Sequence, residues 1–477
     1  MNKIVQNQKL NNLMTVQFPT EETIAAISTA IAPGEGGIAV IRISGPDAIK
    51  AGKSIISIKG NNDWESHRIL YGHVMDKTQR KKIDEVLVLI MKAPRSFTGE
   101  ETIEIHCHGG LIPVQRVMSR VLENPNVRRA LPGEFSQRAV INGRIELTQA
   151  ESISELVGAR SVKAGRIAMN GLDGGIQKKM ESLRKSLLSQ LSEIEARIDF
   201  EDEMPPLNKA ETLNEFLVIH SNLKKLIADS DRANYLRQGI KVALIGCPNV
   251  GKSSLLNLLS RREKAIVTHI PGTTRDTLES QIILEGVPIT LIDTAGIRKT
   301  ENEIEKIGIA RSHKVLETAD ASIMVFDLSN GWREEDKELL KSIPNDIPLI
   351  IVGNKIDIRS KSSNALDDFR LKKKFEYAEI SALNGSGEKE LVSKLLGLFN
   401  VCDTQGLEIA LNERQKELAS KAAEALEQIQ EIARQDLPWD FWTIDLREAI
   451  HKLGELTGDE ITEPLLDEIF SRFCIGK

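Results

Sequence analysis

The chain has 477 residues, of which 41% are hydrophobic and 28% are charged. This composition excludes a disordered chain, and at about 150 residues per domain the length predicts roughly three domains. The formal net charge of -6 excludes a general basic coat for nucleic acid and leaves room only for a local basic patch.

The termini and the cysteines indicate where the protein acts. No apolar run approaches the ~18 residues that a membrane span requires. The first 22 residues have no signal-peptide core. We therefore expect a cytoplasmic protein with no membrane span. The cysteines are scattered without a C-x-x-C pair, which fits a reducing compartment and argues against a structural zinc site. They are Cys107, Cys247, Cys402 and Cys474.

The hydrophobic pattern changes three times along the chain. Over residues 23–141, short apolar runs such as 38–43 and 85–90 are followed closely by Gly or Pro, which predicts strands between short helices. Over residues 142–238 apolar residues recur at three and four positions, which predicts amphipathic helices. Residues 239–398 alternate strand, turn and helix, as in a parallel sheet wrapped by helices. The helical period returns over residues 399–477, so we expect an α/β domain inserted into a helical domain.

The inserted part opens with a phosphate-binding motif. Residues 246–253 read G-C-P-N-V-G-K-S, between an apolar run at 242–245 and a helical pattern. In such a loop backbone N–H groups and a helix N-terminus face a di- or triphosphate, Lys252 neutralises the β and γ oxygens, and Ser253 ligates Mg²⁺. The nucleotide contacts predicted here are Asn249, Val250, Gly251, Lys252, Ser253 and Ser254.

Three further motifs identify the nucleotide as GTP. A predicted strand ends at Asp293, whose carboxylate can hold Mg²⁺ through water, and Thr294, Ala295 and Gly296 follow it. The next pattern is Asn354, Lys355 and Asp357, in which Asp357 accepts from the N1–H and 2-amino group of guanine, whereas adenine presents the wrong pattern. The third motif resembles the guanine O6 clamp of GTPases; its residues are Ser381, Ala382 and Leu383.

A polar segment between the phosphate loop and Asp293 is a candidate switch. Thr274 is the natural second Mg²⁺ hydroxyl, and its loop would order when the γ-phosphate is present. The predicted contacts in this segment are Thr268, His269, Ile270, Pro271, Gly272, Thr273 and Thr274. Some GTPases orient the attacking water with a glutamine after the second motif, but this chain has Ile297. Four other switch residues have suitable chemistry: Arg275, Arg298, Glu303 and Glu305.

Five collinear blocks resemble the MnmE family of tRNA-modification GTPases, also called TrmE. They are residues 29–45 (T-A-I-A-P-G-E-G-G-I-A-V-I-R-I-S-G), 96–100 (S-F-T-G-E), 108–110 (H-G-G), 132–139 (P-G-E-F-S-Q-R-A) and 473–477 (F-C-I-G-K). The resemblance spans about residues 22–477. Residues 1–22 are expected to be a disordered extension, with Met14 as an alternative start.

The resemblance implies a fold class and a division of the chain. An N-terminal α+β folate-binding and dimerisation domain would occupy residues 23–141, and a helical domain residues 142–238 and 399–477. A Ras-like P-loop GTPase domain would occupy residues 239–398. The implied reaction adds an aminomethyl or carboxymethylaminomethyl group at C5 of wobble uridine 34 in certain tRNAs. A homodimer would perform it in a heterotetramer with an FAD protein of the MnmG type.

The resemblance also assigns ligands to single residues. A tetrahydrofolate derivative, 5-formyl- or 5,10-methylene-, would contact Arg42, Glu104 and Arg144. A K⁺ ion that stimulates hydrolysis when two G domains meet would be held by Asn249, Thr268, Ile270 and Thr273. Glu305 matches the residue that orients the attacking water. Cys474 would serve the tRNA reaction and not GTP hydrolysis.

Two other functions remain open at this point. A ribosome-assembly GTPase would use the same nucleotide motifs as a binding switch without covalent chemistry, but it has no use for the N-terminal blocks or Cys474. A folate-dependent methylene transferase could carry the GTPase as a regulator. The pair His106 and His108 looks like a metal site, but no further Cys or His lies near it except Cys107.

Overall fold

The computed structural model describes most of the chain. The residues described are 22–31, 36–60, 63–78, 80–200, 202–205, 207–261, 279–293, 316–358, 375–402, 406–435, 437–460 and 462–476. Contacts divide the chain into two compact units: a first unit of residues 1–154 and 454–477, and a second unit of residues 155–453. Apart from Glu22, the extension expected at residues 1–22 lies outside the described residues.

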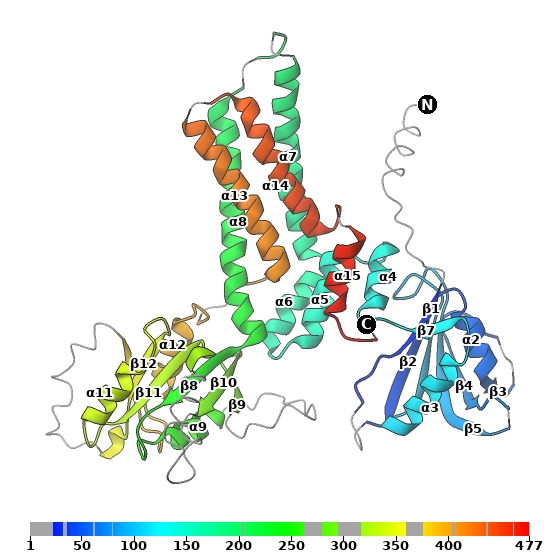
Figure 1. Ribbon diagram of the computed structural model, residues 1–477, viewed down its shortest axis with the longest axis horizontal. Helices are drawn as coiled ribbons and strands as arrows, with labels where there is room; N and C mark the ends of the chain where they lie inside the picture. Colours follow the sequence, from blue (N-terminus) through cyan, green and yellow to red (C-terminus); the bar gives the residue numbers. More distant parts are fainter. Residues whose placement is uncertain are drawn as a thin grey trace. The chain divides into compact units, whose positions relative to one another are not determined.

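A seven-stranded sheet forms the centre of the first unit, drawn in blue and cyan in Figure 1. The strand order is β3-β4-β5-β6-β2-β1-β7, with β1 and β7 parallel and the other neighbours antiparallel. The strands are β1 (Thr23–Ile27), β2 (Ile38–Ser44), β3 (Ile56–Ile58), β4 (Arg68–Met75), β5 (Lys82–Met91), β6 (Thr102–His108) and β7 (Val127–Arg129).

The two faces of this sheet differ because side chains alternate along a strand. Ile41 and Ile43 face a core closed by helices α2 (Ala48–Ile55) and α3 (Leu111–Leu122). Arg42, between them, faces the other side. There α4 (Glu134–Ile141) brings Phe135 against Ile24 and Ala26 of β1. The first unit also holds the C-terminal α15 (Glu463–Ser471) and residues 147–154 of α5 (Leu147–Gly158).

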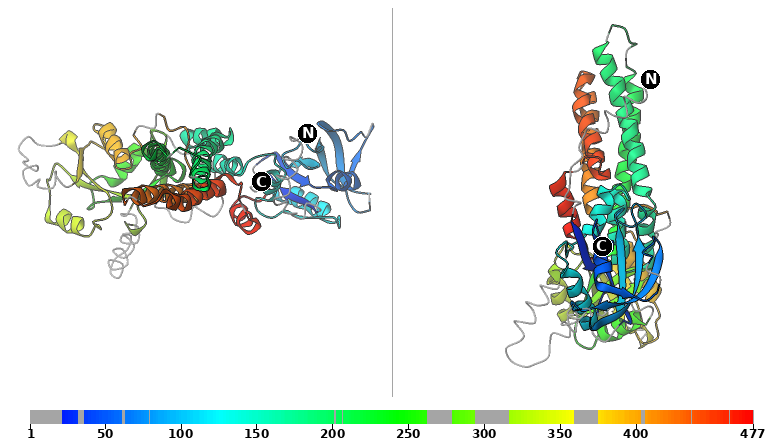
Figure 2. Two further views of the ribbon diagram at one scale, coloured as in Figure 1. Left: turned by 90° about the horizontal axis from the view of Figure 1, so that it is seen from above. Right: turned by 90° about the vertical axis from the view of Figure 1, so that its right-hand side faces the viewer.

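A helical bundle forms one part of the second unit. Its helices are α6 (Val162–Leu172), α7 (Gly175–Asp199), α8 (Lys209–Gln238), α13 (Glu413–Arg434), the short η4 (Trp439–Phe441) and residues 442–453 of α14 (Trp442–Thr457). The long helices before and after the α/β part lie side by side in both views (Figures 1 and 2). Phe216 of α8 packs edge-on against Trp442, with 6.4 Å between ring centroids. Among the described residues no helix has the length and apolarity of a membrane span.

The α/β part of the second unit is a six-stranded sheet with helices on both faces. Its strands are β8 (Ile240–Ile245), β9 (Glu279–Leu284), β10 (Val287–Asp293), β11 (Ala321–Asp327), β12 (Leu349–Asn354) and β13 (Glu376–Glu379). The order is β13-β12-β11-β8-β10-β9, parallel except for β9. Helices α9 (Lys252–Ser260) and α12 (Glu388–Gly397) pack on one face, and α11 (Glu334–Lys341) packs on the other. The predicted fold class is confirmed.

Candidate functional site

The phosphate loop lies between β8 and α9, as the motif predicts. Gly251 ends the loop with φ +97°, a left-handed conformation that L side chains rarely adopt. A Cβ at this position would also overlap the side-chain nitrogen of Asn354. The glycine is therefore required both by the backbone conformation and by the close approach of the base-recognition segment.

Lys252 is held at this loop by backbone oxygens. Its Nζ donates to the carbonyl oxygens of Gly246 at 2.6 Å and Cys247 at 2.8 Å, and the residue is 5% exposed. Ser253 and Ser254 follow on the first turn of α9 and are exposed. A buried ammonium group and an open helix N-terminus suit an anionic ligand.

Asn354 joins three predicted segments. Its Nδ2 donates to the backbone oxygen of Val250 at 2.8 Å, and its Oδ1 accepts from the backbone N–H of Ala382 at 2.9 Å. The residue is 2% exposed. Asp357 lies three residues later in the short helix η2 (Ile356–Ile358) and is exposed, as a carboxylate that reads a base must be. One buried amide thus connects the phosphate loop to the 381–383 loop.

Lys355 of the same motif has a partner that the sequence motifs do not contain. Its Nζ lies 2.7 Å from Oδ2 of Asp327, at the end of β11. Burial raises the pKa of Asp327, but hydrogen bonds from Lys355 and Ser329 outweigh it and lower the pKa to about 2. The backbone of Lys355 is left-handed, with φ +68°. Lys355 is therefore anchored to the neighbouring strand.

Asp293 ends β10 next to the phosphate loop. Its register partner in the parallel strand β8 is Leu244, two residues before Gly246. The carboxyl ends of parallel strands meet at one edge of a sheet, so this placement suits a carboxylate near a phosphate-bound metal. The remaining predicted contacts lie outside the described residues. They are Thr268, His269, Ile270, Pro271, Gly272, Thr273, Thr274, Thr294, Ala295, Gly296 and Glu305.

A second cluster of predicted residues lies in the first unit. Arg42 of β2 and Glu104 of β6 are register partners, and their side chains form an ion pair with nitrogen–oxygen distances of 2.8 and 2.9 Å. The Arg42 guanidinium lies 5.5 Å from the ring centroid of Phe97 and 5.6 Å from that of Phe135. Both charged side chains stay partly exposed. The pair therefore forms a small polar site beside two aromatic rings.

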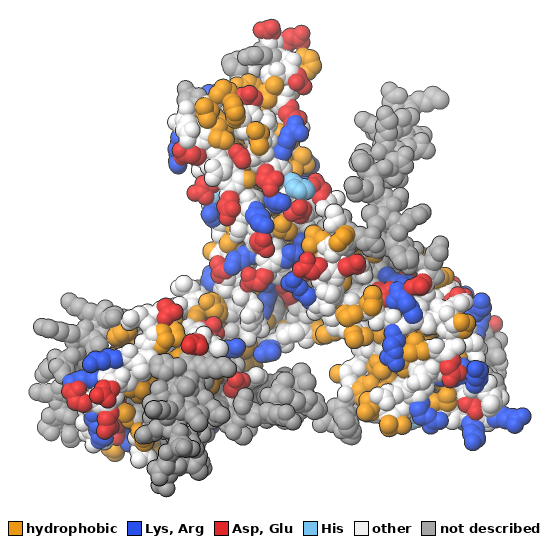
Figure 3. All heavy atoms as spheres, in the orientation of Figure 1, with side chains coloured by type: hydrophobic (Ala, Val, Ile, Leu, Met, Phe, Trp, Pro, Cys, Tyr) orange, Lys and Arg blue, Asp and Glu red, His pale blue; other side chains and the backbone are white. Residues whose placement is uncertain are grey.

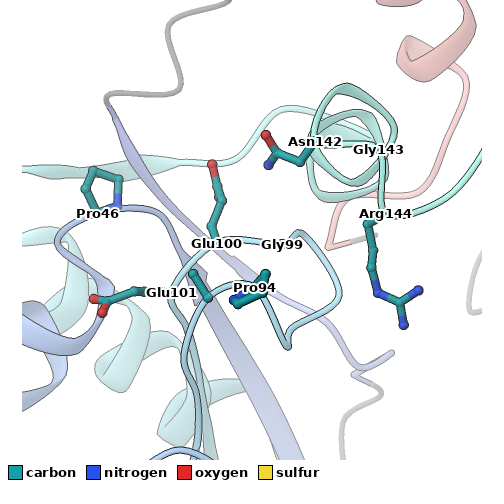
Figure 4. A pocket seen from close by; sticks show the side chains of 9 residues that line it. Pro46, Pro94, Gly99, Glu100, Glu101, Asn142, Gly143 and Arg144 are labelled. Carbon is teal, nitrogen blue, oxygen red and sulfur yellow. The ribbon is translucent and has the colours of Figure 1, made fainter. Parts of the chain in front are cut away.

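Arg144 lies elsewhere in the first unit, on the loop after α4. It lines an open hollow of about 630 Å³ together with Glu100, Glu101 and Asn142. Figure 4 shows its side chain directed away from Glu100. The structure brings Arg42 and Glu104 together but places Arg144 in this separate hollow.

The terminal segment with Cys474 packs within the first unit. Helix α15 contributes Leu466, Ile469 and Phe470 to a cluster with Leu147 and Ala150 of α5. The Cys474 carbonyl then accepts from the N–H of Gly133 at 3.3 Å, just before Phe135. The Cys474 side chain is a free, exposed thiol.

Gly476 brings the tail close to the Arg42 site. A Cβ on Gly476 would lie 2.5 Å from the carbonyl oxygen of Ile27, so the tail passes directly over the end of β1. Ile27 follows Ala26, which is the register partner of Arg42. Residues 474 and 42, far apart in the sequence, therefore belong to one neighbourhood.

Sequence reasoning missed the aromatic and ionic surroundings of this neighbourhood. Phe97 lies in the block S-F-T-G-E and Phe135 in the block P-G-E-F-S. These blocks indicate the family, but they do not show that both rings lie beside Arg42. Glu134, beside Phe135, is 5% exposed and binds Arg128 and Arg138. Burial raises the Glu134 pKa, but the hydrogen bond from Arg128 and those from its other partners outweigh it, and the pKa is lowered.

The comparisons with known proteins cover nearly the whole chain. Residues 23–144 match a family model described as the GTP-binding protein TrmE N-terminus, and residues 147–474 match one described as the MnmE helical domain. The chain is 59% identical over 465 residues to the tRNA modification GTPase MnmE of Prochlorococcus marinus strain MIT 9303, covering 98% of this chain and 100% of the relative. It is 58% identical over 475 residues to the protein of that name from strain MIT 9313, covering 98% and 100%. The solved G domain of the T. maritima FeoB iron transporter is 31% identical, covering 33% of this chain and 97% of the other, with a TM-score of 0.25.

Proposed function

The chain belongs to the MnmE family, so it is a GTPase that takes part in tRNA modification, and we propose the reaction that follows. With an FAD protein of the MnmG type in a heterotetramer, it adds an aminomethyl or carboxymethylaminomethyl group to C5 of wobble uridine 34. A tetrahydrofolate derivative supplies the one-carbon unit, and the reaction takes place in the cytoplasm. The five-part division of the chain at residues 22, 141, 238 and 398 is part of the same proposal.

One observation carries this proposal more than any other. The buried Lys252 and Asn354 form a nucleotide site in the second unit, whereas Arg42, Glu104 and the Cys474 tail meet in the first. A ribosome-assembly switch would need the nucleotide site, but it would have no use for Arg42, Glu104 and the Cys474 tail. The separation supports an enzyme in which nucleotide chemistry and base chemistry are performed by different parts of the chain.

GTP hydrolysis is proposed to use Mg²⁺ and K⁺. The exposed hydroxyl of Ser253 at the start of α9 fits a hard cation that prefers oxygen ligands, and Thr274 would add the second hydroxyl. Asn249 is exposed in the phosphate loop with φ +61°, so its amide oxygen is free to face an ion. When bound, K⁺ supplies positive charge at the β and γ phosphates. Thr268, Ile270 and Thr273 would complete that site, and Glu305 would orient the water.

The folate proposal rests on the donors and acceptors of the Arg42 site. The Glu104 carboxylate can accept from the amino and ring N–H groups of a pterin, and Arg42 can donate to carboxylate or carbonyl oxygens. Phe97 and Phe135 lie within 6 Å of the guanidinium, which suits a flat ring as ligand. Arg144 would contact the glutamate part of the same molecule from its own loop.

Replacing Arg42 with alanine is expected to weaken binding of 5-formyltetrahydrofolate at least about tenfold, because hydrogen bonds to charged groups contribute about 1.5–3 kcal/mol. Isothermal titration measures this directly. Arg68→Ala is the matched control, since Arg68 lies in the same sheet and pairs with Glu65 at an exposed position. Equal affinities for the wild type and Arg42→Ala would contradict the folate assignment.

The homodimer is proposed to form through the open face of the first unit's sheet. Beyond the part covered by α4, this face exposes large apolar side chains on neighbouring strands: Ile69 is 65%, Tyr71 53% and Leu87 44% exposed. Tyr71 and Leu87 are direct register partners, so they form one continuous patch. A second copy of this surface would remove it from water.

Two measurements test the function, one on tRNA from a deletion strain and one on the purified protein. Mass spectrometry of tRNA from cells that lack the chain is expected to show unmodified uridine 34. Purified protein is expected to hydrolyse GTP faster in KCl than in NaCl at equal ionic strength. A fully modified anticodon in the deletion strain would contradict the reaction, and equal rates in the two salts would contradict the K⁺ site.

A further inference from the structure

The β4–β5 hairpin and the neighbouring helix α3 carry a concentration of positive charge. Four cations lie on the hairpin and one on the helix, and all five are exposed; this basic cluster consists of Lys77, Arg80, Lys81, Lys82 and Arg116. Figure 3 shows Lys and Arg side chains gathered along the lower margin of the first unit. The chain as a whole is acidic, with a formal net charge of -6. The cluster is therefore a local feature and not a general property of the surface.

Contacts between the two elements hold the cluster together. Nε of Arg120 on α3 donates to the backbone oxygen of Met75, at the end of β4, at 2.9 Å. Ile83 of β5 and Arg116 of α3 line one open hollow of about 400 Å³, with Gln115 and Ser119 as further polar lining. Of the five cations of the basic cluster, Arg116 lines this hollow, and the paired residues Arg120 and Glu123 line it as well.

The acidic residues near the cluster are already engaged. Asp76 accepts from the Thr78 hydroxyl at 2.8 Å and from the backbone N–H of Arg80 at 2.9 Å. Asp84 holds the ring and the backbone N–H of His108, at 2.7 and 2.9 Å. Glu123 pairs with Arg120 at 3.0 Å. These carboxylates stabilise the hairpin and the helix end.

The cations of the cluster differ from the arginines of the Arg42 and Glu134 neighbourhoods. Arg42, Arg128 and Arg138 each form ion pairs with glutamates. Within the described residues, by contrast, no ion pair joins the five cations of the basic cluster to an acidic side chain, although the charge of Lys81 helps to lower the pKa of Asp76. Lys82 Nζ lies 3.2 Å from Nε2 of His73. Exposed cations gathered on two adjoining elements are expected to attract a polyanion.

We propose that the basic cluster binds the phosphate backbone of the tRNA substrate. The proposal rests on the proposed function, because it names the surface on which the substrate of that reaction lies. An RNA phosphate backbone fits the observations better than an acidic protein surface does. It offers negative charges in a regular row, and exposed Gln115 and Ser119 can donate to phosphate or ribose oxygens, as such side chains commonly do.

The position of the cluster agrees with this role. Glu104 is paired with Leu89 on β5, seven residues from Lys82 at the strand's beginning, which corresponds to about 24 Å along the strand. Arg42 faces the side of the sheet opposite to α3, so an RNA held at the cluster would reach the Arg42 site by passing around the sheet. Helix α3 packs on the sheet face opposite to the one exposing Tyr71 and Leu87, so pairing of two chains leaves Arg116 accessible.

The test compares two double variants with equal changes in charge. Lys81→Gln/Arg116→Gln removes one cation from each element of the cluster. Lys178→Gln/Lys185→Gln removes two exposed cations from α7 of the helical bundle. Filter binding measures the affinity of the full chain for unmodified substrate tRNA from 50 to 300 mM KCl, with and without the flavoprotein partner. GTP turnover, which uses the other unit, is the control for folding.

The cluster variant is expected to bind at least about tenfold more weakly at 100 mM KCl, with a log–log salt slope shallower by about 1.5, because two phosphate contacts are lost. The control variant is expected to match the wild type. Equal weakening of both variants, or unchanged binding of the cluster variant, would overturn the proposal. So would a loss of affinity for the partner protein with tRNA affinity intact. If wild-type protein produced no modified uridine, the proposed function would fail, whatever the binding result.

Discussion

Cys474→Ser protein is expected to hydrolyse GTP at the wild-type rate and to produce at least about 100-fold less modified uridine in a reconstituted reaction. We expect a loss of this size because one positioned acid, base or nucleophile commonly accelerates a reaction by about this factor. Serine keeps the shape of cysteine, but its hydroxyl is far less acidic than a thiol, so it cannot supply a thiolate. GTP turnover is preserved because Cys474 lies in the first unit and the phosphate loop in the second. Mass spectrometry of the tRNA and phosphate release are measured on the same samples.

Cys402→Ser is the matched control, since Cys402 is the other exposed cysteine. Its thiol only donates to the Ser393 carbonyl, at 3.1 Å, and both activities are expected to persist. Gly476→Ala tests the docking of the tail separately. The added methyl would clash with the Ile27 carbonyl oxygen, and alanine disfavours the φ of +95° that Gly476 adopts. It is expected to lower modification without removing the thiol. Normal product from Cys474→Ser would refute the assignment of this residue.

Asp357→Asn is expected to reverse the base preference from GTP to xanthosine triphosphate. The carboxylate accepts from the N1–H and 2-amino group of guanine, whereas an amide can donate to the 2-oxo group of xanthine. GTP affinity should fall about 100-fold, since a hydrogen bond to a charged group contributes up to about 3 kcal/mol. Affinity for xanthosine triphosphate should rise by a similar factor. Competition against a fluorescent nucleotide measures both.

Glu376→Gln makes the same charge change on β13, at another exposed acidic position of the same domain, and should leave the selectivity unchanged. Asp357 is exposed and unconnected to the core, so the substitution should not unfold the domain. The same cannot be expected of Asn354, whose buried amide holds two loops. Unchanged GTP selectivity in Asp357→Asn would show that other residues recognise the base.

The nucleotide motifs could be predicted from the sequence because their chemistry is local. A phosphate loop needs Gly251, Lys252 and Ser253 in a fixed order between a strand and a helix, and all three are consecutive in the chain. The spacing between motifs then follows from the order of strands in a parallel sheet. Lys355 shows the limit of such reasoning. Its motif was recognised, but its partner Asp327 is 28 residues earlier and belongs to no motif.

The fold class, the family and the identity of the nucleotide follow from the order of the amino acids alone. The spacing of apolar residues, the composition and the short motifs are sufficient for these three conclusions. Each of them reflects backbone geometry or chemical groups that lie a few residues apart. Which distant residues meet is visible only in the folded chain. The register of β2 and β6 pairs Arg42 with Glu104, and the packing of α15 brings the tail of Cys474 to the end of β1. The exposed apolar face and the unpaired cations of the hairpin also depend on how the chain folds, because burial and ion pairing arise from contacts that no local pattern encodes.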